Sequence, residues 1–285
     1  MTEVRLEIGY EEYEDGQTII PLIEQLVADE EKSQALTSLV IGDWGGAYER
    51  TPVEFLPTLI DAAPKFPNLR RLFVGDMSFE QCEVSWITQT NLGPLLSAYP
   101  QLESFTIKGS VDLALDPLEH ENLQELVIIC GGLPASVLQA VYGGKLPNLR
   151  KLELYLGVEE YGFDADLEDD ILPFLNNNPF PKLVSLGLKD SELQDEIAIA
   201  AANAPVLAQL EELDLSEGTL SDKGAEALLN SEAVRKLKRL NLNYHYMSDE
   251  MLNKWRRLSQ QTGLIVDTDE QQDLGEEWRY PSLTE

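Results

Sequence analysis

The sequence has few of the residues from which metal and catalytic sites are usually built. It contains two cysteines, Cys82 and Cys130, and two histidines, His120 and His245. One disulfide is arithmetically possible, but a disulfide framework is excluded, and we interpret both cysteines as buried thiols in a reducing compartment. Both histidines lie in polar turns, where we expect structural roles. The composition therefore gives little basis for a metal or nucleophilic site.

Motifs for catalysis or cofactor binding are also missing. The chain has no Gly-x-Gly-x-x-Gly loop, no P-loop and no His-Glu-x-x-His pattern. Neither histidine belongs to a recognisable nucleophile motif. Carboxylate pairs abound, but among 51 acids their adjacency carries no information about acid–base chemistry. We therefore expect no enzymatic activity and no cofactor.

Positive charge is scarce. Lys and Arg number 21 against 51 Asp and Glu, which gives a net charge of -30. A field of this sign repels phosphate backbones and anionic lipid surfaces. We therefore expect neither a nucleic-acid partner nor a membrane partner. Solubility alone explains such a charge, and a basic protein partner is the sharper alternative.

Long apolar segments are missing as well. The longest apolar runs, such as 126–129 and 197–202, are far shorter than the roughly 20 residues needed to span a bilayer. Residues 1–5 lack the basic region followed by an apolar region that marks a secretory signal. The sequence therefore predicts a cytoplasmic protein.

What the chain does have is a repeat, in which the pattern Leu-x-x-Leu-x-Leu recurs with aliphatic or aromatic substitutions. Its three apolar positions are Leu36/Leu39/Ile41, Leu69/Leu72/Val74, Leu102/Phe105/Ile107, Leu123/Leu126/Ile128, Leu149/Leu152/Leu154, Leu183/Leu186/Leu188, Leu210/Leu213/Leu215 and Leu237/Leu240/Leu242. One strand and one helix cannot bury their own apolar face, whereas stacked units bury a continuous leucine core.

The repeat predicts an α/β leucine-rich-repeat solenoid, a curved horseshoe with parallel strands on the concave face and helices on the convex face. We expect it to span residues 1–267, with about eight full repeats between a first strand at 4–8 and a last strand at 264–266. Residues 268–285 are interpreted as an acidic C-terminal tail.

Three repeats depart from the regular spacing. Only 21 residues separate Leu102 from Leu123, with Pro117 between them, so we expect a short turn or a 3-10 turn there in place of a helix. The repeats that begin at Leu69 and Leu149 carry insertions at 77–86 and 157–166. Insertions in repeat arrays form loops, often on the binding side.

Two resemblances support this fold. The segment 210–242, with Leu-Asp-Leu at 213–215 and the helical stretch 222–229, resembles the ribonuclease-inhibitor type of leucine-rich repeat. The stretches 41–45, 82–87, 156–162, 190–197 and 278–280 resemble a bacterial family of cytoplasmic leucine-rich-repeat proteins with no assigned activity. Some members of that family are encoded near radical-SAM and ATP-grasp-like enzymes, which implies a possible class of partner. The resemblance implies no functional residue.

One loop is rich enough in carboxylates to be considered for calcium. Asp164, Asp166, Glu168, Asp169 and Asp170 crowd together beside Glu159 and Glu160. The spacing does not match an EF-hand loop, which needs a glycine at its sixth position and a late glutamate. The simpler interpretation is that Asp166 caps the helix that follows and that the next acids favour its N-terminus. We therefore expect no metal here.

The repeat phase predicts which strand side chains face the concave surface, namely the second, fourth and sixth residues after each first leucine. These positions carry five bases and four acids, so the wall is nearly neutral in a strongly acidic chain. Phe73, Val127, Ile129 and Tyr155 are predicted to be exposed on it, as in a recognition surface. The alternative is an ordinary half-exposed sheet with mixed composition.

We therefore predict a non-catalytic protein-binding scaffold that acts through the concave face, centred on the wall between Phe73 and Tyr155. The alternative is a regulatory or structural subunit of a bacterial enzyme assembly. Candidate binding residues on the wall and in the neighbouring loops are Val40, Trp44, Arg71, Phe73, Trp86, Lys108, Val127, Ile129, Lys151, Tyr155, Tyr161 and Lys189.

Seven bases gather late in the chain and allow a different kind of contact. Helix C-termini account for most of them, but self-association with the acidic remainder of another copy is an alternative. They are Arg235, Lys236, Lys238, Arg239, Lys254, Arg256 and Arg257.

Overall fold

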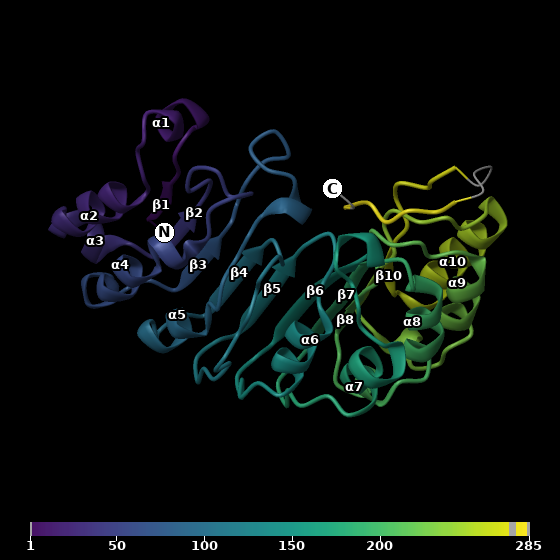
Figure 1. The fold of residues 1–285 in the computed structure, drawn as a ribbon. Helices are drawn as coiled ribbons and strands as arrows, with labels where there is room; N and C mark the ends of the chain where they lie inside the picture. Colours follow the sequence, from purple (N-terminus) through teal and green to yellow (C-terminus); the bar gives the residue numbers. More distant parts are fainter. Residues whose placement is uncertain (1, 274–277, 284–285) are drawn as a thin grey trace. The chain divides into compact units, whose positions relative to one another are not determined.

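The computed structural model (Figure 1) describes residues 2–273 and 278–283, which form two compact units. The first unit comprises the chain up to Cys130 together with Gly143–Leu149, and the second comprises Gly131–Tyr142 and the chain from Arg150 onward. The repeat pattern runs through both units without marking this division. A single solenoid over residues 1–267 therefore stays a prediction.

In the described part of the first unit, five parallel strands lie in chain order. They are β1 (Glu3–Leu6), β2 (Ser38–Ile41), β3 (Arg71–Val74), β4 (Ser104–Lys108) and β5 (Glu125–Ile129). Equivalent positions of the repeat are in register, because Leu39 pairs with Leu72, Leu72 with Phe105, and Phe105 with Leu126.

The second unit follows the same plan over the residues described. Its parallel strands are β6 (Lys151–Gly157), β7 (Ser185–Ser191), β8 (Glu212–Asp214), β9 (Arg239–Asn241) and β10 (Ile265–Asp267). Leu152, Leu186, Leu213 and Leu240 are in register across them. The predicted strands are confirmed, with the first and last displaced by one or two residues, and the fold of each unit is α/β and of the leucine-rich-repeat kind.

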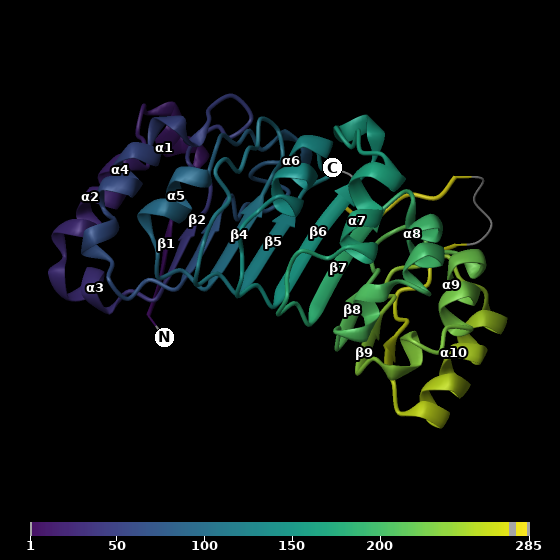
Figure 2. The same ribbon diagram turned by 90° about the horizontal axis from the view of Figure 1, so that it is seen from below.

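Helices connect the strands and lie on one face of each sheet (Figures 1 and 2). Those of the first unit are α1 (Tyr10–Glu14), α2 (Ile20–Ala28), α3 (Glu30–Ala35), α4 (Leu56–Asp61) and α5 (Gly93–Ala98). Those of the second are α6 (Ala135–Tyr142), α7 (Leu172–Asn176), α8 (Gln194–Ala201), α9 (Asp222–Leu229) and α10 (Asp249–Thr262). None of the helices in the described part of the chain combines the length and the apolar character needed to cross a bilayer.

The leucines of the repeat form the core of each unit. Leu39 and Leu126 in the first unit and Leu186 and Leu213 in the second have no exposed surface. They alternate along the strands with half-buried or exposed side chains, as expected for a sheet covered by helices on one face. We call the other face of each sheet, which carries the alternating side chains, the open face.

Side chains link successive helices of the second unit at their N-termini. Ser221 caps α9 by accepting a hydrogen bond from Lys223 N, and Ser248 caps α10 by accepting one from Met251 N. The carboxylate of Asp195 in α8 accepts from the Ser221 backbone N and hydroxyl. Asp222 in α9 repeats this with Ser248. Each helix therefore helps to fix the start of the next.

The short repeat between Leu102 and Leu123 has no helix, as predicted, and forms turns and short bridges instead. His120 lies here and is buried, with Nε2 hydrogen-bonded to Tyr99 O at 3.1 Å. His245 is also buried, with Nε2 hydrogen-bonded to Thr268 O at 3.0 Å. Burial lowers the pKa of both histidines, and their hydrogen bonds to backbone support the predicted structural roles.

Candidate interaction surfaces

The open face of the first unit has the composition predicted from the repeat phase. Val40 pairs in register with Phe73, Phe73 with Thr106, and Thr106 with Val127. Val40, Phe73 and Ile129 are half-buried, so each presents part of its apolar side chain. The predicted exposure of Val127 is wrong, because it is only 7% exposed; a short branched side chain within a sheet is covered by its cross-strand neighbours.

Two of the bases on this face, Arg5 and Lys108, have partners within the unit. Arg5 in β1 forms ion pairs with Glu7 and Asp76. Lys108, at the end of β4, donates from Nζ to Met77 O, and burial lowers its pKa. Arg71 remains exposed at the start of β3. Arg5 and Lys108 therefore join strands to loops, whereas Arg71 faces solvent.

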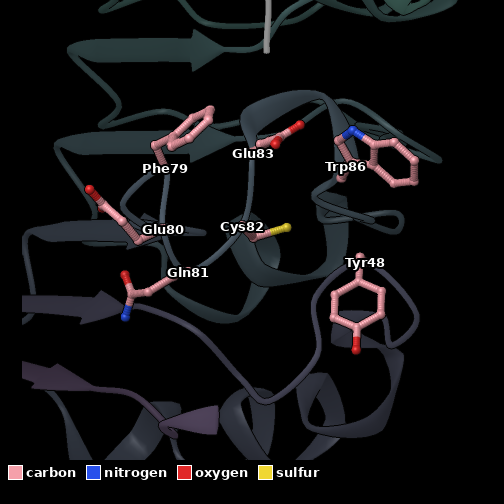
Figure 3. A pocket seen from close by; sticks show the side chains of 7 residues that line it. All are labelled: Tyr48, Phe79, Glu80, Gln81, Cys82, Glu83 and Trp86. Carbon is pink, nitrogen blue, oxygen red and sulfur yellow. The ribbon is translucent and has the colours of Figure 1, made fainter.

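The insertion after β3 forms one wall of a pocket in the first unit (Figure 3). The pocket has a volume of about 340 Å³ and is lined by Tyr48, Phe79, Glu80, Gln81, Cys82, Glu83 and Trp86. We call this set the aromatic pocket. Cys82 lies in the middle of the set, with Phe79 and Trp86 on opposite sides and Tyr48 below (Figure 3).

Hydrogen bonds within the insertion shape this pocket. Ser78 N donates to Gln81 Oε1 at 2.8 Å, and Cys82 N donates to Ser78 O at 3.1 Å. A 3-10 turn at Val84–Trp86 then presents Trp86, which is 60% exposed. Among the lining residues, the candidate set predicted from the sequence contained Trp86 but missed Tyr48 and Phe79. Phe79 lies in the insertion that the repeat spacing identified, so it could have been included. Nothing in the sequence around Tyr48 indicates a role in the pocket.

Trp44 does not belong to an accessible surface. It is 3% exposed, stacks at a tilt on Phe55 with ring centroids 5.7 Å apart, and donates from Nε1 to Arg50 O at 3.0 Å. A large indole gains more free energy by filling the core than by facing water. Its predicted place among exposed candidates is therefore wrong.

The second insertion, which includes Tyr161, packs closely on its own unit. A Cβ at Gly132 would meet Tyr161 O at 2.4 Å, and one at Gly157 would meet Gly131 O at 1.8 Å. Gly157 also has a φ of +74°, which glycine adopts without strain. The glycines therefore allow the loop that carries Tyr161 to lie directly against residues 131–132. Tyr161 itself is half-buried.

The open face of the second unit is built around Lys189 in β7, which was predicted to be an accessible base. It is instead 6% exposed. Its Nζ lies 2.7 Å from Glu217 Oε1, 3.9 Å from Asp214 Oδ2, and 4.4 Å from the centroid of the Tyr155 ring. Burial acts to lower the pKa of Lys189, but Asp214 and Glu217 raise it overall, so the ammonium stays charged. The two carboxylates offset part of the cost of burying this charge.

Tyr155 takes part in the same cluster. Lys189 Nζ donates to Tyr155 Oη at 2.9 Å, and the Tyr155 side chain is half-buried. Burial raises the pKa of Tyr155, and the Glu217 carboxylate raises it further. Lys151, in β6, is paired with Glu153 at 3.0 Å. Of the side chains predicted to receive a partner on this face, Tyr155 and Lys189 thus contact each other, and Lys151 is paired with Glu153.

Residues 278–283, which we call the C-terminal segment, lie against the ends of β7, β8 and β9 (Figure 1). Tyr280 N donates to Tyr246 Oη at 3.0 Å, and Tyr246 Oη donates to Tyr280 O at 2.9 Å. Ser282 N donates to Glu217 O at 2.7 Å, and Leu283 N donates to an oxygen of Asp190 at 2.7 Å. Residues 274–277 and 284–285 of the predicted tail lie outside the described residues.

Asp190, which accepts a hydrogen bond from the C-terminal segment, has an unusual environment for a carboxyl group. It has no exposed surface and a φ of +54°. Oδ1 accepts from Leu283 N, whereas Oδ2 is buried without a hydrogen-bond partner among the described residues. Burial raises its pKa from 3.8 to about 9, although the amides of Leu283 and Ser282 act in the opposite direction. Burial of Asp190 therefore favours its protonated form.

In the acidic loop at 164–170, Asp166 caps the helical segment that follows it, as predicted. Asp166 Oδ1 accepts hydrogen bonds from Glu168 N at 2.7 Å and Asp169 N at 3.0 Å. Asp164 Oδ1 accepts from Ala135 N at the start of α6, and Asp170 accepts from Asp166 N. The cap opens a single π-type turn at Leu167–Ile171 that leads into α7. Within residues 2–273 and 278–283, no cluster of potential ligands is arranged to hold a metal ion.

Several of the late basic residues are neutralised locally. Arg235 pairs with Glu232, Lys238 with Glu211, Arg239 with Glu212 and Lys254 with Glu250. These are exposed pairs, each of which contributes little to stability. Self-association through the basic residues stays a prediction.

Comparison with known proteins identifies a relative of this fold. The chain is similar to a Bacteroides fragilis protein of known crystal structure, with 34% sequence identity and a TM-score of 0.87 over 99% of this chain and 77% of that chain. It is also aligned with an internalin from Listeria monocytogenes at 12% identity, over 86% of this chain and 63% of that one, but the TM-score of 0.35 carries no argument. The sequence matches no protein-family model and no curated protein. Because the 34% identity extends over nearly its whole length, the chain belongs to the same protein family as the Bacteroides fragilis protein.

Proposed function

We propose that this protein is a non-catalytic, cytoplasmic scaffold that binds another protein through the open faces and strand ends of its leucine-rich repeats. The observation that carries the proposal is the C-terminal segment. The ends of β7, β8 and β9 hold this segment of the same chain by hydrogen bonds to its backbone at Tyr280, Ser282 and Leu283. A surface that binds backbone in this way can accept protein chains of varied sequence.

The chemistry of the contact supports a protein partner. Two tyrosine hydroxyls, from Tyr244 and Tyr246, donate to the same backbone carbonyl of Tyr280. The guanidinium of Arg279 lies 5.6 Å from the centre of the Tyr246 ring. Tyrosine and arginine are the residue types that dominate protein interfaces.

The open face of the first unit supplies apolar contact area. Phe73 and Ile129 are half-buried on that face, and Arg71 is exposed beside them on β3. In the described residues of this face, Phe73 is the aromatic side chain that extends from the middle of a strand. We therefore propose Phe73 as an anchor for the partner. The repeats are further proposed to be of the ribonuclease-inhibitor type, in line with the capped helices α9 and α10.

Affinity capture from the native cell, followed by mass spectrometry, tests this function. We expect Phe73→Ala to reduce recovery of the partner at least about tenfold, because aromatic anchors carry a large share of binding free energy. The matched control is Ile199→Ala, which removes an apolar side chain that is 40% exposed on α8. Equal recovery by wild type and Phe73→Ala would refute binding through the open face. Capture of one enzyme in fixed stoichiometry would instead identify the protein as a subunit of that enzyme.

A further inference from the structure

The aromatic pocket gathers large apolar side chains that are open to solvent. Tyr48 is 46% exposed, and Phe79 and Trp86 are each 60% exposed. They come from two separate loops, the turn after β2 and the insertion after β3, which meet at this pocket. Exposed aromatic side chains cost free energy in water, and their concentration at one place is typical of a binding site.

Carboxylates lie among these aromatic rings. Glu80 and Glu83 both line the pocket, and over residues 2–273 and 278–283 neither has an ion-pair partner within 4 Å. The pKa of Glu80 is lowered by its own backbone amide and by the Ser78 hydroxyl, so it stays ionised. The pocket therefore presents two carboxylates that form no ion pair with the described residues.

The floor of the pocket is chemically inert. Burial raises the pKa of the Cys82 thiol to about 11, and the carboxylates of Asp43 and Glu83 add to this effect, while Lys108 opposes it. Cys82 is therefore a neutral thiol near pH 7 and not a nucleophile. Lys108, the cation that lowers the pKa of Cys82, is already hydrogen-bonded to Met77 O.

We propose that the aromatic pocket binds the cationic side chain of an arginine or lysine in a basic segment of a protein partner. The faces of Tyr48, Phe79 and Trp86 supply the negative ends of their ring quadrupoles, to which a cation is attracted. Glu80 and Glu83 supply charge-assisted hydrogen bonds to its N–H groups.

The volume and the charge of the chain agree with this ligand. About 340 Å³ is enough for one long side chain and lies near the lower limit for a small-molecule site. The net charge of -30 attracts a basic partner from a distance and repels an anionic ligand. The inference rests on the proposed protein-binding function and names the chemistry of one contact within it.

A synthetic peptide tests the pocket without the physiological partner. The probe is acetyl-Gly-Arg-Gly-Arg-Gly-amide, and its control replaces each arginine by citrulline, which keeps the shape and removes the charge. The readout is the NMR signal of the Trp86 indole N–H, assigned by its loss in Trp86→Phe. We expect a saturable shift with the arginine peptide and none with the citrulline peptide.

Charge variants separate a specific site from general attraction. Glu80→Gln with Glu83→Gln is expected to weaken arginine-peptide binding about fivefold or more. The matched control, Glu24→Gln with Glu31→Gln, removes two exposed acids from α2 and α3 of the same unit and changes the net charge equally. We expect it to leave binding unchanged within about twofold.

Three outcomes overturn the inference: no shift up to about 10 mM peptide, an equal shift with the citrulline peptide, or equal weakening by both pairs of variants. Failure of the peptide test together with capture of a partner that needs Phe73 would refute the pocket and keep the proposed function. Peptide binding without any captured partner would support the pocket and count against the proposed function.

Discussion

The two units have the same core and differ in what lies over their strands. In the first unit, Phe73 on the open face and Trp86 in the insertion after β3 reach solvent. In the second unit, Lys189 and Tyr155 engage each other on the open face, and the C-terminal segment covers the strand ends. The leucine repeat therefore sets the framework of both units, whereas the residues between the leucines decide whether a face is free to bind.

The largest expected effect tests whether the cores are equivalent. Leu72→Ala in the first unit and Leu213→Ala in the second each remove a side chain with at most 1% exposure. We expect each to lower the free energy of unfolding by about 3 kcal/mol, because both delete buried methyl groups and leave a cavity. Urea denaturation followed by circular dichroism measures this loss. A loss below about 1 kcal/mol for only one of the two would show that the units are not equally packed.

The next prediction concerns two bases, the buried Lys189 and the half-buried Lys108. Lys189→Met leaves Glu217 and Asp214 without their cation, and we expect it to lower the free energy of unfolding by roughly 2–4 kcal/mol. Lys108→Met in the first unit removes a hydrogen bond to Met77 O, and we expect a loss of only about 1 kcal/mol. Denaturation of both variants under the same conditions gives the difference. Equal losses would mean that the ion pairs of Lys189 contribute no more to stability than the single hydrogen bond of Lys108.

A pH series sharpens the comparison through Asp190. Burial raises its pKa in the folded chain from 3.8 to about 9. The folded pKa is above the unfolded one, so this group's contribution to stability is complete below about pH 4 and is lost as the pH rises through about 9. The variant Asp190→Asn cannot ionise, and we expect its stability relative to wild type to increase between these limits, by at most about 1.4 kcal/mol per pH unit.

Asp43 in the first unit provides the counterpart for this series. Burial also raises its pKa, but Oδ1 accepts a hydrogen bond from Gly45 N, which opposes the shift. Asp43→Asn is therefore expected to show the same sign of pH dependence over a narrower pH range, and so a smaller total change. A relative stability of Asp190→Asn that does not change from pH 5 to pH 9 would show that Asp190 is ionised in the folded protein.

The smallest expected effect concerns the C-terminal segment. Tyr246→Phe removes the hydroxyl that contacts both N and O of Tyr280, at a cost of about 1 kcal/mol to docking of the segment. We expect faster hydrogen exchange at the Ser282 and Leu283 amides and little change in the leucine core. Unchanged exchange at these amides would show that the tyrosine does not hold the segment.

The sequence was most informative where the physical constraint is local and repeated. Each template leucine must be buried, so spacing alone predicted the strands, their parallel order and the open-face positions. The same phase could not predict the burial of Val127 or Lys189, because burial depends on which side chains from other strands lie beside them. Lys189 is buried because Glu217 lies after the next strand, 28 positions away in the chain.

The candidate surfaces were predicted less completely, for a related reason. The insertion at 77–86 marked Trp86, but Tyr48 reaches the same pocket from a separate turn. Docking of the C-terminal segment depends on Asp190, which is 93 positions from Leu283. Such contacts join residues that share no repeat period, so no pattern along the chain indicates them.

Hydrogen exchange of the complex with the captured partner tests the central claim most directly. We expect binding to slow exchange at the ends of β3 and β4 and in the insertion that carries Phe79 and Trp86, while helices α4 and α5 exchange as in the free protein. Slowed exchange confined to those helices, with no change around Phe73, would contradict a scaffold that binds through its open face.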